Sequence, residues 1–137
     1  MRRRQNSVVS GVALFTLTLT GAAAPAAGDN DGPYLVGDGL MASFVGATLI
    51  GSNWAEYYAP DGGIIGKVRY LGILRDFTGR WTVKRDQVCF EYEWSEFNTC
   101  SRFRRVGDHM QHFGPDGKPK TDGESRRLPG NRLEDFH

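Results

Sequence analysis

Short runs of alternating apolar and polar residues, separated by Gly, Asn and Asp, constrain the fold of this chain more than any other feature. Such runs begin at Thr48 and are clearest from Phe77 to Lys84, where every second residue is apolar or Gly. Pro60-Asp61-Gly62-Gly63 precedes another such run and predicts a tight turn. The pattern predicts a mainly β fold, a small antiparallel meander or barrel-like sheet.

The only two cysteines, Cys89 and Cys100, lie on two of these runs. If they face each other across a hairpin, Phe90 faces Thr99 and Val88 faces Ser101. One side of the hairpin is then aromatic and the other carries the cysteines with Glu and Arg residues. We expect the aromatic side to be buried and the disulfide to lie on the outward side, although a one-residue bulge would reverse the faces. A spacing of eleven on strands indicates a structural disulfide rather than a redox pair.

The first residues have the composition of an export signal. Arginines occupy positions 2–4, an uncharged apolar run extends from Val8 to Leu19, and small residues fill positions 21–27. We expect residues 1–27 to be a secretory signal, cleaved near Ala26 or Ala27, and the protein to be periplasmic or secreted. The apolar run is about a dozen residues long, whereas a membrane-spanning helix needs roughly 20, so no permanent span is expected after cleavage. A retained segment that anchors the protein is the alternative.

Removal of such a signal changes the charge of the protein. All 16 acidic residues follow residue 27, whereas three of the 17 Lys and Arg residues precede it, which leaves a formal charge of −2. A mildly acidic protein has no electrostatic footprint for nucleic acid. The roughly 110 residues that remain are enough for one small domain.

After the predicted signal at residues 1–27, composition divides the rest of the chain into three segments. Residues 28–39 are rich in Gly and Asp and are predicted to be a flexible leader. Residues 40–113 form the predicted β-rich domain, which begins with a short helix over about Gly39–Gly46, capped by Asp38, or with a loop whose apolar residues point inward. Residues 108–113 are expected to form one more edge strand. Residues 114–137 have too few apolar side chains to hold a core position and are predicted to be a polar, mobile tail.

The middle of the chain contains a recognisable succession of short motifs. They are Gly51-Ser52-Asn53, Tyr57–Gly62, Gly79–Val83, Asp86–Phe90 and Cys100. The pattern is a Tyr-x-Pro-Asp-Gly type of turn, a Gly-x-Trp strand, and Val-Cys followed by a second cysteine. In this pattern the chain resembles a family of small exported proteobacterial proteins that are classed as a domain of unknown function. The resemblance covers about residues 46–106. It implies a compact antiparallel sheet or small barrel with one internal disulfide, and it implies no activity.

Two groups of polar residues invite a catalytic or metal-binding interpretation. His109 and His112 would share a face only on a helix, and the flanking glycines favour a strand, so we expect two exposed residues and no metal or cofactor. Glu91, Glu93 and Glu96 lie beside arginines and are expected to form a solvated, ion-paired face rather than a pair of catalytic carboxyls.

Aromatic residues are dense for so small a domain, and most of them are expected to form its core. They could instead line a ligand groove or a recognition patch. Candidate surface residues are Tyr58, Trp94, Arg102 and Arg104. We expect a monomeric, non-catalytic binding or inhibitor-like module whose partner is a protein, a cell-wall fragment or a small molecule. The alternative is a small periplasmic hydrolase that uses a Glu or His on the cysteine-bearing hairpin.

Overall fold

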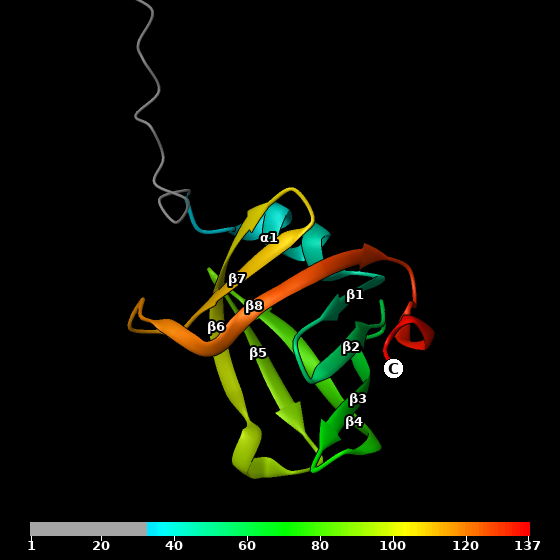
Figure 1. Ribbon diagram of the computed structural model, residues 1–137. Helices are drawn as coiled ribbons and strands as arrows, with labels where there is room; N and C mark the ends of the chain where they lie inside the picture. The colour runs from blue at the N-terminus through cyan, green and yellow to red at the C-terminus, as the bar shows by residue number, and fades with distance from the viewer. Residues whose placement is uncertain (1–32) are drawn as a thin grey trace, which may run out of the picture.

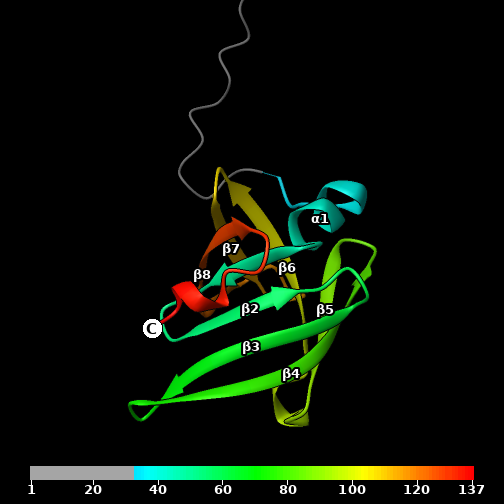
Figure 2. The same ribbon diagram turned by 90° about the vertical axis from the view of Figure 1, so that its right-hand side faces the viewer.

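The computed structural model describes residues 33–137, which form a closed antiparallel barrel of eight strands in chain order (Figures 1 and 2). The prediction of a mainly β, antiparallel fold with one helix and one disulfide is confirmed. The predicted signal and its cleavage site lie outside the described residues. The strands are β1 (Ala47–Ile50), β2 (Trp54–Tyr58), β3 (Gly63–Tyr70), β4 (Ile73–Lys84), β5 (Gln87–Tyr92), β6 (Thr99–Val106), β7 (His109–Phe113) and β8 (Pro119–Pro129).

The cysteine-bearing hairpin has the predicted register. In the β5–β6 pair, Cys89 lies opposite Cys100, Phe90 opposite Thr99 and Val88 opposite Ser101. The disulfide joins the two cysteines with a Cα–Cα distance of 4.0 Å. Val88 and Phe90 belong to the core, so alternation directs the cysteines to the outer face of the barrel, as predicted. Beyond this pairing the chain leaves the sheet through the 3₁₀ helix η1 (Ser95–Phe97).

Two hairpins show how local sequence sets the strand connections. Asp61 Oδ1 accepts a hydrogen bond of 2.8 Å from the Gly63 N–H, and Trp81 Nε1 donates one of 3.0 Å to the Ala59 carbonyl, which ties the β2–β3 turn to β4. β3 and β4 are joined by Leu71 and Gly72 alone, both in the left-handed region with φ of 51° and 75°. Positive φ at both residues is typical of a type I′ turn, whose twist matches that of the strands.

The prediction for the C-terminal segment is wrong. Residues 119–129 form β8, which pairs with β7 on one side and with β1 on the other and thereby closes the barrel (Figure 1). β7 is consequently not an edge strand. After β8, the 3₁₀ helix η2 (Leu133–Asp135) packs Leu133 and Phe136 against Ala55 on the outside of β2. Backbone hydrogen bonds to two neighbouring strands hold β8 in the sheet, so its place in the barrel does not depend on many apolar side chains.

The helix α1 (Gly37–Phe44) covers one end of the barrel (Figure 1). Its Leu40 and Phe44 are fully buried. The Phe44 ring lies 4.7 Å from the Phe103 ring and 4.9 Å from the Tyr58 ring, both edge to face. Aromatic pairs in this geometry add stabilisation beyond the area they bury. α1 therefore acts as an apolar plug that fills the upper half of the barrel.

The first described residues also contact the barrel, which the sequence did not predict. The Leu35 N–H donates to the Phe103 carbonyl at 2.8 Å, and the Tyr34 ring lies 5.4 Å from the Phe113 ring. The prediction of a flexible leader is therefore wrong for residues 33–39. The helix begins at Gly37 without a side-chain cap, so Asp38 lies in its first turn instead of preceding it, where its charge still favours the helix N-terminus.

Candidate functional site

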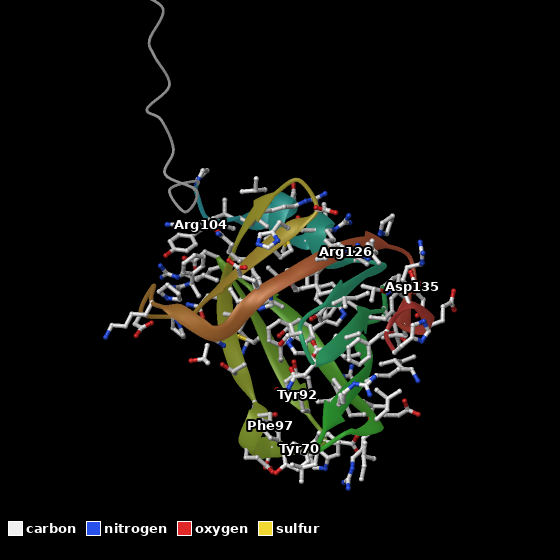
Figure 3. The ribbon with its side chains drawn as sticks, in the orientation of Figure 1. Tyr70, Tyr92, Phe97, Arg104, Arg126 and Asp135 are labelled. Carbon is white, nitrogen blue, oxygen red and sulfur yellow. A yellow bond between two sulfur atoms is a disulfide. The ribbon has the colours of Figure 1, made fainter. Side chains whose placement is uncertain are left out.

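The half of the barrel far from α1 contains a cavity of about 810 Å³ that is partly open to solvent. Figure 3 shows Tyr70 and Phe97 at the end of the barrel far from α1, and both residues line this cavity. Its walls come from β2 to β8 and from the segment around η1. The principal apolar lining residues are Trp54, Val68, Phe77, Phe90, Tyr92 and Trp94, and the polar ones include Glu56, Ser101, His112 and Lys120. A closed eight-stranded barrel has an interior of the size that holds one small ligand.

Strand alternation explains how the wall is built. Trp54, Glu56 and Tyr58 on β2 line the cavity, while Ala55 and Tyr57 between them pack outside against the η2 region. On β3, the absence of a side chain at Gly66 makes room for the ring of Phe77, its partner on β4. A Cβ at Gly66 would lie 2.2 Å from Phe77 Cζ, closer than atoms can approach. Gly66 thus allows an aromatic ring to lie flat against the wall.

Glu56 is a buried carboxyl at the centre of this wall. Tyr58 Oη donates a hydrogen bond of 2.5 Å to Glu56 Oε2, and Tyr92 Oη donates one of 2.7 Å to Oε1. Burial raises the pKa of Glu56 above its ordinary value, and the two hydroxyl donors oppose that rise only in part. Burial and the neighbouring Glu56 also raise the pKa of both tyrosines, so they remain neutral donors.

Two basic groups of the cavity lie on β7 and β8. His112 Nε2 lies 2.7 Å from Ser125 Oγ, and burial, with the charge of Lys120 second, lowers the pKa of His112 to about 4. Lys120 Nζ donates to Ser101 Oγ at 2.5 Å and to Thr99 Oγ1 at 2.9 Å. Burial lowers the pKa of Lys120 from its ordinary value of 10.5. At neutral pH the histidine is therefore uncharged.

The ionisable groups of the cavity lack ionic partners within residues 33–137. The four ion pairs of this part of the chain involve neither Glu56 nor Lys120. Lys120 is instead held by two neutral hydroxyls, and Glu56 by two phenols. Buried charges in proteins are usually paired, so a half-buried ammonium beside an aromatic cavity without an acidic partner marks a candidate functional site.

The four predicted surface residues have different places in the barrel. The expectation that Tyr58 reaches the surface is wrong: only 1% of it is exposed, because β2 turns it inward onto Phe44 and Glu56. Trp94 is half-buried and lines the cavity. Arg104 lies over the Tyr34 ring at 4.5 Å, and Arg102 forms an ion pair with Asp86 at 3.4 Å. Both arginines are half-buried beneath the chain's own N-terminal segment, and a recognition role for them remains a prediction.

The histidine and glutamate predictions are partly corrected. His109 and His112 lie on a strand, as expected, and point to opposite faces. His109 pairs with Glu124 on the outside, but His112 lines the cavity, so the expectation that both are exposed is wrong. β7 forms part of the wall of a closed barrel, and every second side chain of such a strand points inward. Glu91, Glu93 and Glu96 are exposed, as predicted, but none of them belongs to the ion pairs found within residues 33–137, so the expectation of an ion-paired face is wrong.

Glu56 and Lys120 were not identified from the sequence as site residues. The signal for Glu56 is its position in Trp54-Ala55-Glu56-Tyr57-Tyr58, where it shares the phase of two aromatic residues that face the core. A charged residue in the inward phase of a strand must either be neutralised or line a cavity. Lys120 gave no comparable signal, because β8 has no apolar phase to compare it with.

No helix among residues 33–137 is long and apolar enough to span a membrane. The disulfide indicates an oxidising compartment outside the cytoplasm. Comparison of the chain with protein families, with curated proteins and with solved structures finds no match. The family resemblance described above therefore remains a prediction, and the geometry of the cavity is the basis for any inference about function.

Proposed function

We propose that this protein is an exported, non-catalytic module that binds one small amphipathic acid inside its barrel. The observation that carries the proposal is the cavity of about 810 Å³, whose aromatic walls surround an ammonium group without an acidic partner among the described residues. Pockets for small molecules are typically of this size, mainly apolar, with a few placed polar groups. The disulfide supports export to the periplasm or the cell exterior.

The acidic group is assigned to Lys120 for a chemical reason. An ammonium has three donors, and the described hydrogen bonds direct two of them to the Thr99 and Ser101 hydroxyls. A carboxylate on the ligand would form a charge-assisted bond with the remaining donor, which is stronger than a bond to a neutral acceptor. Glu56, whose pKa is raised by burial, would contribute a second polar contact from β2.

The apolar part of the ligand would lie between the rings of the cavity. The Phe77 ring is 5.7 Å from the Tyr92 ring and 6.0 Å from the Trp94 ring, so these side chains form one continuous aromatic surface. Trp54 adds a ring on β2 and contacts His112 at 5.7 Å. Two of the three tryptophans thus line the cavity and can report on its occupancy.

Fluorescence titration tests this proposal. The chain starting at residue 28 is titrated with a medium-chain fatty acid, an aromatic carboxylic acid and the matching alcohols. We expect the acids to quench or shift the tryptophan emission and to bind about tenfold more tightly than the alcohols, the effect of one hydrogen bond to a charged group. Lys120→Met should remove this preference, and Lys118→Met, an exposed residue just before it, should preserve it.

Three outcomes would count against the proposal. If no acid or alcohol changes the emission, the cavity does not bind such ligands. If acids and alcohols bind equally well to the original protein, Lys120 does not recognise an anionic group. If Lys118→Met abolishes the preference as strongly as Lys120→Met, the effect is one of general charge. Mass spectrometry of the exported protein tests cleavage near Ala26 or Ala27 independently.

An acid–base enzyme is the second candidate, supported by a separate observation. Glu56 and His112 line one cavity, and burial shifts their pKa values in opposite directions. Groups whose pKa values are shifted in opposite directions can take the roles of proton donor and proton acceptor. This hydrolase would use the β2 carboxyl and not the exposed Glu91 or Glu93. Turnover of an aromatic ester that is lost in both Glu56→Gln and His112→Gln would favour it over simple binding.

A further inference from the structure

The tip of the β3–β4 hairpin carries a cluster of exposed apolar side chains that lie outside the core of the barrel. Tyr70 is 64% exposed, Leu71 83%, Ile73 57% and Leu74 41%. They are neighbours in the sequence Tyr-Leu-Gly-Ile-Leu, and Tyr70 pairs directly with Ile73 across the hairpin. Figure 2 shows this tip projecting beyond the rest of the barrel. Contiguous exposed apolar surface of this kind marks an interaction site in a soluble domain.

The backbone of the turn adds a second observation. Leu71 has a φ of 51°, a conformation that Asn, Asp and Gly adopt readily and that a leucine side chain disfavours. The first central position of this turn therefore holds a residue that is poorly suited to the turn and almost fully exposed to solvent. Neither the local conformation nor the core accounts for a leucine at this place, and an external apolar partner does.

The charges behind the tip indicate what kind of partner fits. Arg69 and Arg75 flank the five apolar-tip residues, and neither forms an ion pair within residues 33–137. One step further from the tip, Lys67 is neutralised by Asp76 at 3.0 Å. In an anionic bilayer, acyl chains lie beneath a layer of phosphates. Apolar side chains at the tip would contact the acyl chains, and the two unpaired arginines behind them would lie at the level of the phosphates. Arginine side chains can extend to those phosphates while their stems remain among apolar groups.

We propose that the Tyr70–Leu74 turn inserts into the surface of an anionic lipid bilayer. A narrow, projecting hairpin can enter the headgroup layer but offers no broad face for a protein partner. Phe97 is also exposed at the cavity mouth, but it lies beside Glu96, whose charge is repelled by an anionic surface. The β3–β4 hairpin, rather than the segment around η1, is therefore the part that inserts. Because Tyr70 and Arg75 also line the cavity, insertion brings the open end of the barrel against the membrane.

Vesicle binding tests the proposal, with the chain starting at residue 28 so that the apolar run Val8–Leu19 cannot bind lipid itself. All strands and the disulfide lie in the part that remains. We expect sedimentation with vesicles that contain phosphatidylglycerol, weaker binding to phosphatidylcholine alone, and a loss of binding in high salt. The paired substitution Leu71→Asn and Ile73→Thr should lower partitioning at least about tenfold, since it removes two inserting side chains.

The variants are chosen so that folding is preserved. Asn is favoured in the left-handed conformation of Leu71, and Thr suits a strand, so the melting temperature should not fall. Val106→Asn is the matched control, because Val106 is 61% exposed at the end of β6, next to the turn glycine Gly107. The turn between β6 and β7 lies beside α1, at the end of the barrel opposite the β3–β4 tip (Figure 1). Arg69→Gln with Arg75→Gln should reduce binding only to the anionic vesicles.

The emission of Leu71→Trp should shift to the blue when anionic vesicles are added, which reports insertion of the tip itself. The proposal is overturned if the original protein binds neither kind of vesicle, or if the tip variants and Val106→Asn bind equally well. It is also overturned if the protein self-associates in solution and the tip substitution abolishes that association, because the turn would then contact a second copy. These outcomes are independent of ligand binding in the cavity.

Discussion

Replacement of His112 should change how the stability of the barrel depends on pH. The folded barrel lowers the pKa of this histidine from 6.5 to about 4. Between these values the unfolded chain binds a proton that the folded protein excludes, so protonation favours unfolding. The contribution of His112 to stability is complete above pH 6.5 and is lost progressively as the pH falls toward 4. His112→Gln keeps a polar partner for Ser125 but has no proton to gain.

The size of the effect follows from the two pKa values. Their difference, at about 1.4 kcal/mol per pKa unit, corresponds to about 3 kcal/mol of unfolding free energy. The physical source is the loss of hydration when an imidazolium is placed inside the barrel, with repulsion from Lys120 as the second contribution. An effect of this size is a large part of the unfolding free energy of a typical domain, which is about 5–15 kcal/mol.

Urea unfolding followed by tryptophan fluorescence between pH 4 and pH 7 measures this contribution directly. Other groups also titrate in this range, so the informative quantity is the difference between His112→Gln and the original protein at each pH. We expect the variant to gain up to about 3 kcal/mol relative to the original protein on acidification. His109→Gln, on the outer face of the same strand, is the control. Parallel pH profiles for the original protein and His112→Gln would refute the reasoning.

Four further predictions concern the fold and the buried carboxyl. Phe44→Ala should lower the unfolding free energy by about 3–5 kcal/mol in denaturant titrations, because it empties the plug of the barrel. Serines at Cys89 and Cys100 should lower it by about 3 kcal/mol, a loss that reduction of the original protein should reproduce. A chain ending at residue 113 should give the dispersionless NMR spectrum of an unfolded protein, because β8 closes the barrel. Because the pKa of Glu56 is raised in the folded protein, its contribution to stability is present below pH 4.5 and is lost as the pH rises. Glu56→Gln cannot lose a proton, so its stability relative to the original protein should increase progressively as the pH rises, as measured by urea midpoints.

The hairpins could be predicted because their determinants are local. Alternation places Phe77 and Trp81 on the buried face, and the turn at Pro60–Gly63 joins β2 to β3. The register of the disulfide hairpin follows from one assumed pair, since antiparallel partners keep a constant sum of residue numbers. In these segments the apolar phase, the turn residues and the covalent link all agree.

Closure of the barrel could not be predicted in the same way. β1 and β8 are joined by pairs such as Ala47 with Pro129, which are separated by most of the domain. The inward residues of β8 include Ser125, which bonds to His112, and Lys120, which lines the cavity. A strand that faces a polar cavity wall has no apolar phase, so the pattern that reveals other strands is missing here.

The amino-acid sequence alone determined the β class, the order of the hairpins and the partner of each cysteine, because neighbouring residues specify turns and strand faces. The tertiary structure alone decided that the sheet closes, and closure turned Glu56, His112 and Lys120 toward one shared cavity. Alternation distinguishes the two faces of a strand but carries no information on which face becomes the inside of a barrel or how much of that inside is filled. The candidate site is therefore a consequence of curvature and long-range pairing, which no local pattern in the chain encodes.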